Sequence, residues 1–365
     1  MGAWTENWLR QKSGIVIALL GLCPPCATIG AMGNVTRYET AGGQCIYCFQ
    51  IEAFPTLPAN IYVVDDGDQV TLVDCGSGLE RSNQDLVAGF EALGEEHGAP
   101  ISLETVDRIV ITHGHVDHFG GLPFVRQFSE APIGVHILDR RVLSNYEERV
   151  VVAARRLETY LERAGVAAKQ RQNLMSMYLY AKGVYRSTAV AFLLEEGSMA
   201  LSGMEIFHVP GHCPGQVCLR LDDMLLTADH VLARTTPHQA PEAITLNMGL
   251  GHYLQSLDKI AALKGIALGL GGHEAPIRDL GARIDQIRAL HDRRLEQVLE
   301  ICQVPRSIAE VSHQLFGDVS SYHVLLALEE TGAHVEYLYQ RGELLAMNLE
   351  EIERESNAVI RYERL

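Results

Sequence analysis

The sequence predicts an α/β fold, with one large domain followed by a small domain of helices and a hairpin. Apolar runs of strand length recur along the chain, and four of them end in a short loop that carries histidine or aspartate. Stretches of charged and apolar residues with helical spacing lie between and after these runs. The 365 residues are 47% hydrophobic and 21% charged, which suits a globular enzyme of this size.

The first of these loops is the most informative part of the chain. The apolar run 108–112 predicts a buried strand, and it is followed directly by His113, His115, Asp117 and His118. Two histidines two residues apart at a strand end can turn toward one ion, and the aspartate and histidine just beyond can serve a second. Imidazole and carboxylate are ligands that zinc, iron and manganese accept. The loop therefore predicts a metal centre.

Three later strand ends carry residues of the same kind: His212 after 206–209, Asp229 after 225–228, and His273 after 268–272. A single histidine at a strand end is usually a structural residue. Four strand ends that supply metal-ligand types in one chain are difficult to explain by packing. We therefore expect these loops to meet at a common site.

In this order of ligands the sequence resembles the metallo-β-lactamase-fold hydrolases, which include glyoxalase II-type thioesterases, lactonases, ribonucleases and lactamases. The resemblance covers residues 44 to 278 and implies an αββα sandwich with a two-metal site at one edge. By resemblance, one ion would be held by His113, His115 and His212, the other by Asp117, His118 and His273, with Asp229 bridging the two. Asp74 matches an early acid of the family that orients a ligand histidine.

The resemblance also implies the chemistry. Two divalent ions about 3.5–4 Å apart make a bridging hydroxide available near neutral pH and polarise a carbonyl or phosphoryl oxygen. Zinc is the expected metal, with iron and manganese as alternatives. Asp117 would be catalytic as well as a ligand, because it can accept a hydrogen bond from the nucleophile. A cysteine nucleophile at Cys213 is then unnecessary, and we expect a metal-dependent hydrolase.

The N-terminal segment 1–33 leaves three interpretations open. Residues 14–31 are mostly apolar and follow Arg10 and Lys12, the layout of an export or membrane signal, although Pro24 and Pro25 interrupt it. Translation could instead start at Met32, or the segment could be ordered structure. The eight cysteines do not suggest a disulfide framework, which favours a reducing compartment and a cytoplasmic location.

Two CxxC pairs, at 23–26 and 45–48, have a spacing compatible with a structural zinc site. The second pair lies in a predicted strand. Residues three apart on a strand point to opposite faces, which is poor geometry for a shared ion. We therefore favour unpaired cysteines here.

The catalytic domain is expected to span 34–278, with a helical insertion at 139–190. This insertion is rich in tyrosine and methionine and lies between His118 and His212. Two interpretations stay open: helices that pack on the sandwich, and a lid whose side chains shape an apolar pocket. A lid of this kind favours a substrate with an acyl or aryl portion.

Residues 279–365 predict helices at 285–302, 307–316 and 320–330, the last ended by Gly332, and then a hairpin over 335–347. Ser307 and Glu310 predict a capping box. Three helices and a hairpin indicate a winged-helix-like domain. The segment resembles the tail of the lactamase-beta-2-like branch of the family.

Charge argues against nucleic acid as a partner. The chain has a net charge of −16, and residues 285–365 hold 15 Asp and Glu against 8 Arg and no Lys, without the basic stripe that nucleic acid requires. We expect the tail to dock on the active site or to mediate a homodimer. A membrane is expected as a partner only if the N-terminal segment is a true signal.

The functional hypothesis is a hydrolase of acyl thioesters, on coenzyme A or a carrier protein, with a small-molecule acyl group as substrate. The alternatives are a lactonase or other ester hydrolase, and an endoribonuclease. A binding protein with a vestigial metal site is a further alternative, which the complete ligand set opposes. The choice of thioester rests largely on analogy, because a fold by itself does not define a substrate.

Overall fold

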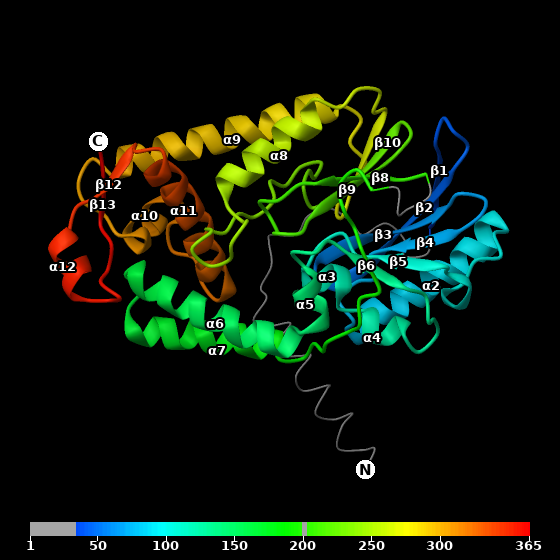
Figure 1. Cartoon of the computed structure of the whole chain (residues 1–365), viewed down its shortest axis with the longest axis horizontal. Coiled ribbons are helices and arrows are strands. Elements are labelled where there is room, and N and C mark those ends of the chain that lie inside the picture. The colour runs from blue at the N-terminus through cyan, green and yellow to red at the C-terminus, as the bar shows by residue number, and fades with distance from the viewer. Residues whose placement is uncertain (1–33, 199–202) are drawn as a thin grey trace, which may run out of the picture.

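The predicted α/β sandwich is confirmed by the computed structural model, which describes residues 34–198 and 203–365. Within these residues, two sheets face each other and helices cover their outer sides (Figure 1). The C-terminal helices, which begin at Leu280 and are called the helical unit below, lie at one end. The predicted leader at 1–33, with the CxxC pair at 23–26, lies outside the described residues.

The first sheet follows the order of the chain. In the described residues its strands are β1 (Thr36–Glu39), β2 (Cys45–Phe54), β3 (Leu57–Asp65), β4 (Val70–Val73), β5 (Arg108–Val110), β6 (Ile133–Val135) and β7 (Phe192–Leu193). Strands β1 to β4 pair antiparallel, and β4 to β7 pair parallel. A parallel pair needs a crossover, and helix α2 (Glu80–His97) and the short helix η1 (Leu103–Thr105) lie in the crossover between β4 and β5.

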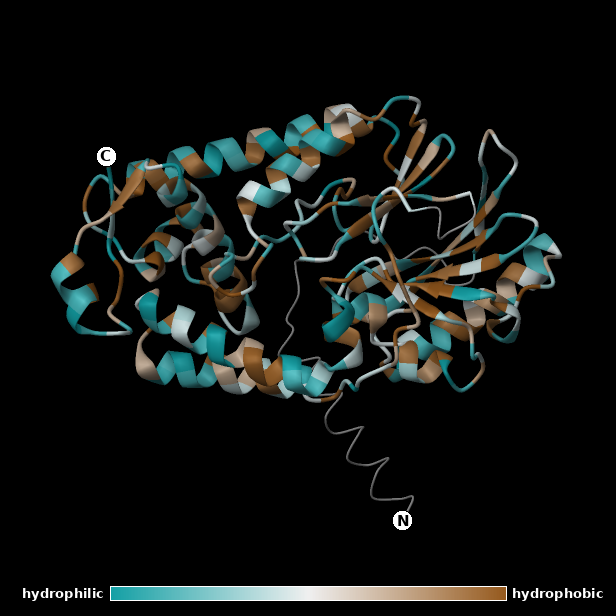
Figure 2. Cartoon of the chain, viewed as in Figure 1, coloured by the Kyte–Doolittle hydropathy of each residue, from teal (hydrophilic) through white to brown (hydrophobic). Residues whose placement is uncertain are grey.

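The second sheet has the order β11-β10-β9-β8, with β8 (Glu205–His208), β9 (Val217–Leu221), β10 (Met224–Ala228) and β11 (Leu268–Gly271). Successive side chains along these strands point to opposite faces of the sheet, so the second sheet contributes to two hydrophobic cores. Val217 and Leu219 pack against the first sheet, whereas Cys218 between them packs toward α8 (Leu250–Ala261) and α9 (Leu280–Ile301). In Figure 2 the strands are mostly brown, whereas α9 carries much teal along its length.

The ligand loops meet because of this topology. Strand β8 runs in the same direction as β10 and β11, so their carboxyl ends share one edge. The backbone N–H of Val217 donates to Thr112 O (3.0 Å), which ties the end of β5 in the first sheet to the same edge. Each predicted ligand follows one of these four strand ends. The candidate site therefore lies at the junction of the two sheets.

The insertion at 139–190 is helical, as predicted. It contains α5 (Arg140–Ser144), α6 (Tyr146–Arg163) and α7 (Ala168–Lys182), and α6 and α7 extend away from the sheets toward the C-terminal helices (Figure 1). Leu157 and Leu174 share a core with Leu325 and Leu328 of the C-terminal unit, whereas Tyr146 packs in the core of the first sheet. The insertion therefore joins the sandwich to the helical unit.

The three predicted C-terminal helices are present as α9, α10 (Ile308–Phe316) and α11 (Tyr322–Gln340). The capping box of Ser307 and Glu310 is formed. The predicted end of the third helix at Gly332 is wrong, because α11 continues to Gln340. Gly332 faces Tyr160, and a Cβ at this glycine would lie 2.0 Å from the Tyr160 hydroxyl oxygen. The glycine thus serves close helix packing and not helix termination.

The first strand of the predicted hairpin, over 335–339, is also wrong, since these residues belong to α11. Val335 and Leu338 are three apart and both buried in the core of the helical unit, as helical spacing requires. The two-stranded sheet is formed by β12 (Leu344–Ala346) and β13 (Tyr362–Arg364), with α12 (Leu349–Arg354) between them.

Cys45 and Cys48 lie on β2 as unpaired thiols. Cys45 packs against the core beneath α2, and Cys48 packs against the core between the sheets. The two side chains therefore point to opposite faces, which confirms the geometric argument against an ion shared by this pair.

Candidate metal centre

The structure brings all seven predicted ligands together. Their ligand atoms form three groups, each within 4.8 Å: His113, His115 and His212; Asp117, His118 and His273; and His113, His118 and Asp229. Asp229 Oδ2 lies 3.8 Å from His212 Nε2 and 3.3 Å from His273 Nε2. One carboxylate thus reaches both histidine sets, as a bridging ligand must.

The donor atoms of this cluster fit a divalent metal. His118 Nε2, His212 Nε2 and Asp229 Oδ1 are buried, and none has a hydrogen-bond partner within the described residues. A buried polar atom without a partner costs about 1–3 kcal/mol, and such atoms are rare in native structures. Imidazole nitrogens and carboxylate oxygens that converge in this way match the ligand chemistry of zinc, iron and manganese.

Three of the histidines are oriented by a hydrogen bond from Nδ1. His212 Nδ1 lies 2.7 Å from the backbone oxygen of His238, and His273 Nδ1 lies 2.6 Å from that of Pro58. His118 Nδ1 lies 2.8 Å from Asp74 Oδ2. Such a bond fixes the tautomer and turns Nε2 toward the centre of the cluster.

Asp74, the predicted orienting acid, follows β4 with φ of 63°, a left-handed conformation that aspartate tolerates better than most residues. Its carboxylate also accepts from Thr112 N and Thr112 Oγ1, both at 2.8 Å. The same carboxylate thereby fixes both the strand end before His113 and the ring of His118.

Asp139 is a supporting residue that the sequence analysis missed. Its buried carboxylate accepts from Gly114 N (2.8 Å) and Gly215 N (3.0 Å), which belong to two different ligand loops. A Cβ at Gly215 would lie 2.6 Å from Asp139 Cγ, so this close approach requires glycine. Asp139 follows shortly after β6, and a polar residue beyond a further strand end was the available signal.

Cys213, beside His212, is a partner of the same carboxylate, with its Sγ 3.3 Å from Asp139 Oδ2. Burial and the charge of Asp139 raise the pKa of the Cys213 thiol well above its usual value. A nucleophilic cysteine needs a lowered pKa. The thiol is therefore a packing residue, in agreement with the expectation from sequence.

The electrostatics of the cluster favour a cation. Burial lowers the pKa of His113, His115 and His212, which keeps these rings neutral as metal ligation requires. Burial opposes a charge on His273, yet Asp229 and Asp117 raise its pKa to about 10. The carboxylates thus create a strongly negative potential at the point where the ligand atoms meet.

Two further residues near the cluster come from helices outside the sandwich. Lys182, at the end of α7, is half-buried; burial lowers its pKa, and the charges of Asp117 and Glu329 oppose this. Glu329 of α11 lies 3.0 Å from His238 Nε2 through its Oε2. Neither belongs to a strand-end pattern, so periodicity alone could not have identified them.

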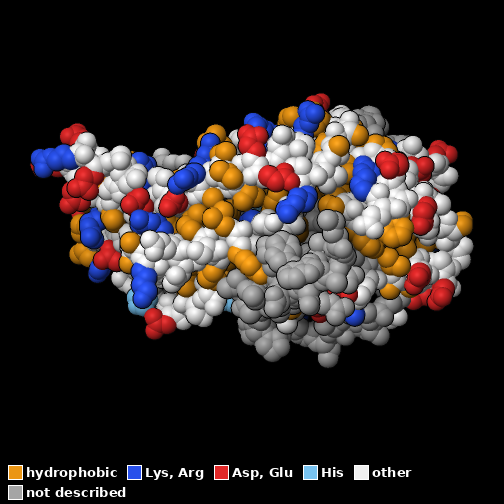
Figure 3. Space-filling view, turned by 90° about the horizontal axis from the view of Figure 1, so that it is seen from below, with side chains coloured by type: hydrophobic (Ala, Val, Ile, Leu, Met, Phe, Trp, Pro, Cys, Tyr) orange, Lys and Arg blue, Asp and Glu red, His pale blue; other side chains and the backbone are white. Residues whose placement is uncertain are grey.

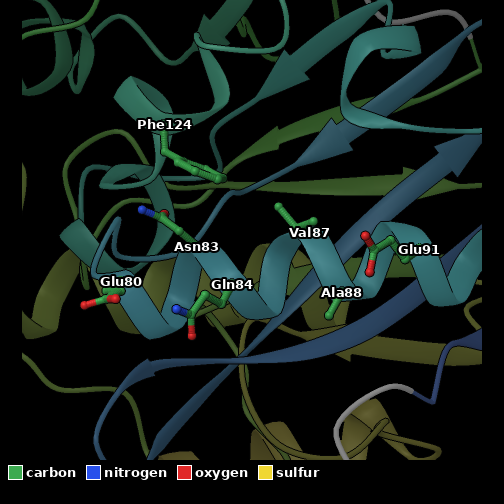
Figure 4. Close-up of a pocket in the computed structure, with 7 residues that line it drawn as sticks. All are labelled: Glu80, Asn83, Gln84, Val87, Ala88, Glu91 and Phe124. Carbon is green, nitrogen blue, oxygen red and sulfur yellow. The ribbon is translucent and has the colours of Figure 1, made fainter.

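A groove elsewhere on the molecule does not compete with this site. It has a volume of about 390 Å³ and follows one face of α2, with Phe124 on its far side (Figure 4). Its lining residues are Glu80, Asn83, Gln84, Val87, Ala88, Glu91 and Phe124. This set includes no histidine, cysteine or paired base that could perform catalysis.

Comparison with known proteins agrees with the geometry. The family model of the metallo-beta-lactamase superfamily matches residues 55–273. The probable metallo-hydrolase YqjP of Bacillus subtilis is 25% identical over 288 residues, which cover 76% of this chain and 86% of YqjP. The atrochrysone carboxyl ACP thioesterase of Aspergillus fumigatus is 26% identical over 243 residues, 66% of this chain and 58% of that protein.

A solved structure supports the same fold. The crystal structure of a beta-lactamase domain protein from Burkholderia ambifaria aligns with a TM-score of 0.72 at 24% identity, and the alignment covers 94% of this chain and 97% of that one. Among the helices of residues 34–198 and 203–365, none has the length and hydropathy needed to cross a membrane. Because the family model spans more than half of the chain, we conclude that the chain belongs to the metallo-beta-lactamase superfamily and is a metal-dependent hydrolase.

Proposed function

We propose that this hydrolase cleaves an acyl thioester carried by coenzyme A or by an acyl-carrier protein. The observation that carries the proposal is an aromatic cluster directly beside the ligand loop. Phe119 follows His118, and its ring centroid lies 5.8 Å from that of Tyr146 in α6. Tyr146 in turn lies 6.0 Å from Tyr185, beyond the end of α7.

This cluster connects the helical insertion to the metal centre. Burial, together with the nearby charge of Asp117, raises the pKa of Tyr185, so the phenol stays neutral. On α7, Met175 and Tyr178 are partly buried against the core of the helical unit. The buried, neutral rings of Phe119, Tyr146 and Tyr185 make the surroundings of the ligand loop apolar on the side of the insertion, which favours an apolar acyl chain. The thioesterase relative, whose name specifies an acyl-carrier substrate, supports the same class.

The residues of the centre have defined tasks in such a reaction. Bound divalent ions, with zinc as the first choice, supply hydroxide near neutral pH and a Lewis acid for the thioester carbonyl. Asp117 accepts a hydrogen bond from the attacking water and orients it toward the acyl carbon. The water oxygen bonds to that carbon, the carbon–sulfur bond breaks, and the products are a carboxylic acid and a thiol. Asp74 and Asp139 hold the ligand loops in place.

The surface charge supports a substrate other than RNA. On the face in Figure 3, the described Lys and Arg side chains (blue) are interspersed with Asp and Glu (red), and they do not form a continuous stripe. Residues 285–365 carry nearly twice as many acidic as basic residues. Binding to a phosphate backbone depends on clustered basic side chains.

The proposal is tested by a substrate panel with the zinc-loaded protein. We expect release of free thiol from acyl-CoA or acyl-carrier thioesters and little cleavage of single-stranded RNA. Lactones are the third member of the panel. The substitution Asp117→Asn should reduce the rate of thioester hydrolysis at least about 100-fold, as expected when a group that orients the nucleophile is lost. Preference for a lactone or for RNA over every thioester would refute the proposed substrate class.

A further inference from the structure

We propose that Glu330, on α11 of the C-terminal unit, is a positioning residue for the metal ligand His212. The connection runs through the loop that follows β10. The backbone oxygen of His238 in this loop lies 2.7 Å from His212 Nδ1. The next residue, Gln239, donates its backbone N–H to Glu330 Oε2 at 2.7 Å. The peptide group between His238 and Gln239 thus directs its carbonyl at the ligand and donates its N–H to a carboxylate of a distant helix.

The carboxylate of Glu330 has polar partners on several sides. It is buried, with Oε1 2.5 Å from Arg294 Nη1 of α9 and Oε2 3.3 Å from His238 Nδ1. Burial opposes its ionisation, yet His238, His334 and Arg294 together lower its pKa below the usual range. A carboxylate with three polar partners, two in the loop and one on α9, holds the loop more rigidly than a surface ion pair would.

The side chain of His238 strengthens the same connection. Its Nε2 lies 3.0 Å from Glu329 Oε2, so both imidazole nitrogens face carboxylates of α11. The ring of His238 is thus held against α11, while the backbone oxygen of the same residue stays directed at His212.

The consequence for the ligand is a fixed tautomer. A carbonyl held in place accepts the Nδ1 proton of His212, which leaves the Nε2 lone pair free in the cluster. If the loop moved, the ring could rotate or take the other tautomer, and the set of His113, His115 and His212 would lose a preorganised ligand. The set of Asp117, His118 and His273 has its own orienting partners and does not depend on Glu330.

A second interpretation of this region is a further metal site at His291, Glu330 and His334, whose ligand atoms lie within 4.8 Å of one another. The hydrogen bonds oppose it. His334 Nδ1 lies 2.7 Å from Glu330 O, and His334 Nε2 lies 3.0 Å from His291 Nδ1. Arg294 already neutralises the carboxylate and would repel a cation. We therefore interpret His291 and His334 as residues that pack behind Glu330 and hold it in place. The experiment below also shows whether they bind metal.

The experiment measures zinc affinity in two single-site backgrounds, by competition with a chromophoric chelator. His273→Ala leaves the set of His113, His115 and His212, and His212→Ala leaves the other set. We expect Glu330→Gln to weaken zinc binding about 10–100-fold in the His273→Ala background, the range for loss of groups that orient metal ligands. In the His212→Ala background the change should stay below about threefold.

Glu336→Gln is the matched control. Glu336 also lies on α11 and accepts backbone N–H groups of the same loop, from Glu242 at 2.7 Å and Ala243 at 3.1 Å, but it does not touch His238 or Gln239. It should lower thermal stability without selective loss of zinc affinity. If Glu330→Gln does not fold, Arg294→Gln, which leaves the carboxylate in place, should give a smaller weakening of the same set.

Three results would overturn the proposal. One is equal weakening in both backgrounds, and another is an effect of Glu336→Gln as large as that of Glu330→Gln. The third is a further zinc ion in the unmodified protein that disappears in His291→Ala, which would assign the cluster to metal binding. Because the readout is zinc affinity, the outcome does not depend on the identity of the acyl substrate.

Discussion

At the scale of single residues, three of the histidines proposed as metal ligands are oriented by partners outside the ligand set. His118 is held by Asp74, His273 by Pro58 O and His212 by His238 O. Of these partners, Asp74 is the one whose side chain makes the contact. It is therefore the supporting residue that can be tested most directly by substitution.

We expect Asp74→Asn to reduce zinc affinity or activity about 10–100-fold, because the amide cannot both accept from Thr112 and replace the anionic partner of His118. The size and position of the side chain are preserved, so the fold should be retained. Zinc titration with a competing chelator and the rate of thioester hydrolysis measure the effect. Glu91→Gln, an exposed change on α2, is the control, and an Asp74→Asn protein that matches it in both measurements would show that Asp74 has no orienting role.

The residue scale also shows what the sequence could predict. The seven candidate ligands follow strand ends, and histidine and aspartate in that pattern are rare enough to be noticed without a structure. Asp139 is different, because it accepts from the backbone N–H groups of Gly114 and Gly215, and a backbone donor does not reveal its partner through the type of its side chain. Glu330 likewise acts on the backbone of Gln239, 91 positions away. Contacts of side chains with distant backbone leave no pattern in the sequence.

At the scale of elements, the strands that precede the candidate ligands and the three C-terminal helices were predictable from periodicity. The errors concern the end of α11 and the partner of β12, which is β13. Glycine often marks the C-terminal end of a helix, and the sequence therefore predicts that the helix ends at Gly332. Here Tyr160 of α6 packs against this glycine, and its hydroxyl donates to Leu328 O at 2.5 Å. Tertiary packing has overridden local propensity, because the contact is available only after α6 and α11 come together.

Gly332→Ala tests this explanation. Alanine favours an isolated helix by about 1 kcal/mol over glycine, but overpacking a close contact costs about 1–3 kcal/mol. We expect a net decrease in the free energy of unfolding, measured by denaturant titration. Gly281→Ala in α9 is the matched control, since its Cβ would have 3.7 Å to the nearest atom and should be neutral or stabilising. A stabilised Gly332→Ala protein would contradict the packing explanation.

At the scale of the whole molecule, the candidate site depends on every layer of the fold. One group of ligands comes from the loop after β5 in the first sheet, and the others come from loops of the second sheet. Helix α11 supports one of these loops, and the core of the helical unit joins α11 to α6 and α7. Sequence patterns predicted the strand-end residues that the structure brings together at the junction of the two sheets. They could not place the helical unit against the site, because that arrangement depends on contacts between segments far apart in the chain.

This arrangement predicts that metal and stability are coupled. Ions held between loops of the two sheets bind the folded protein and not the unfolded chain, so each contributes RT ln(1 + [L]/Kd), about 2.7 kcal/mol when free metal is 100 times Kd. Chelation should therefore lower the melting temperature by several degrees, and added zinc should restore it. The His113→Ala protein should respond less, because one ligand set is incomplete. A melting temperature that is unchanged by chelator in the unmodified protein would show that metal does not link the sheets.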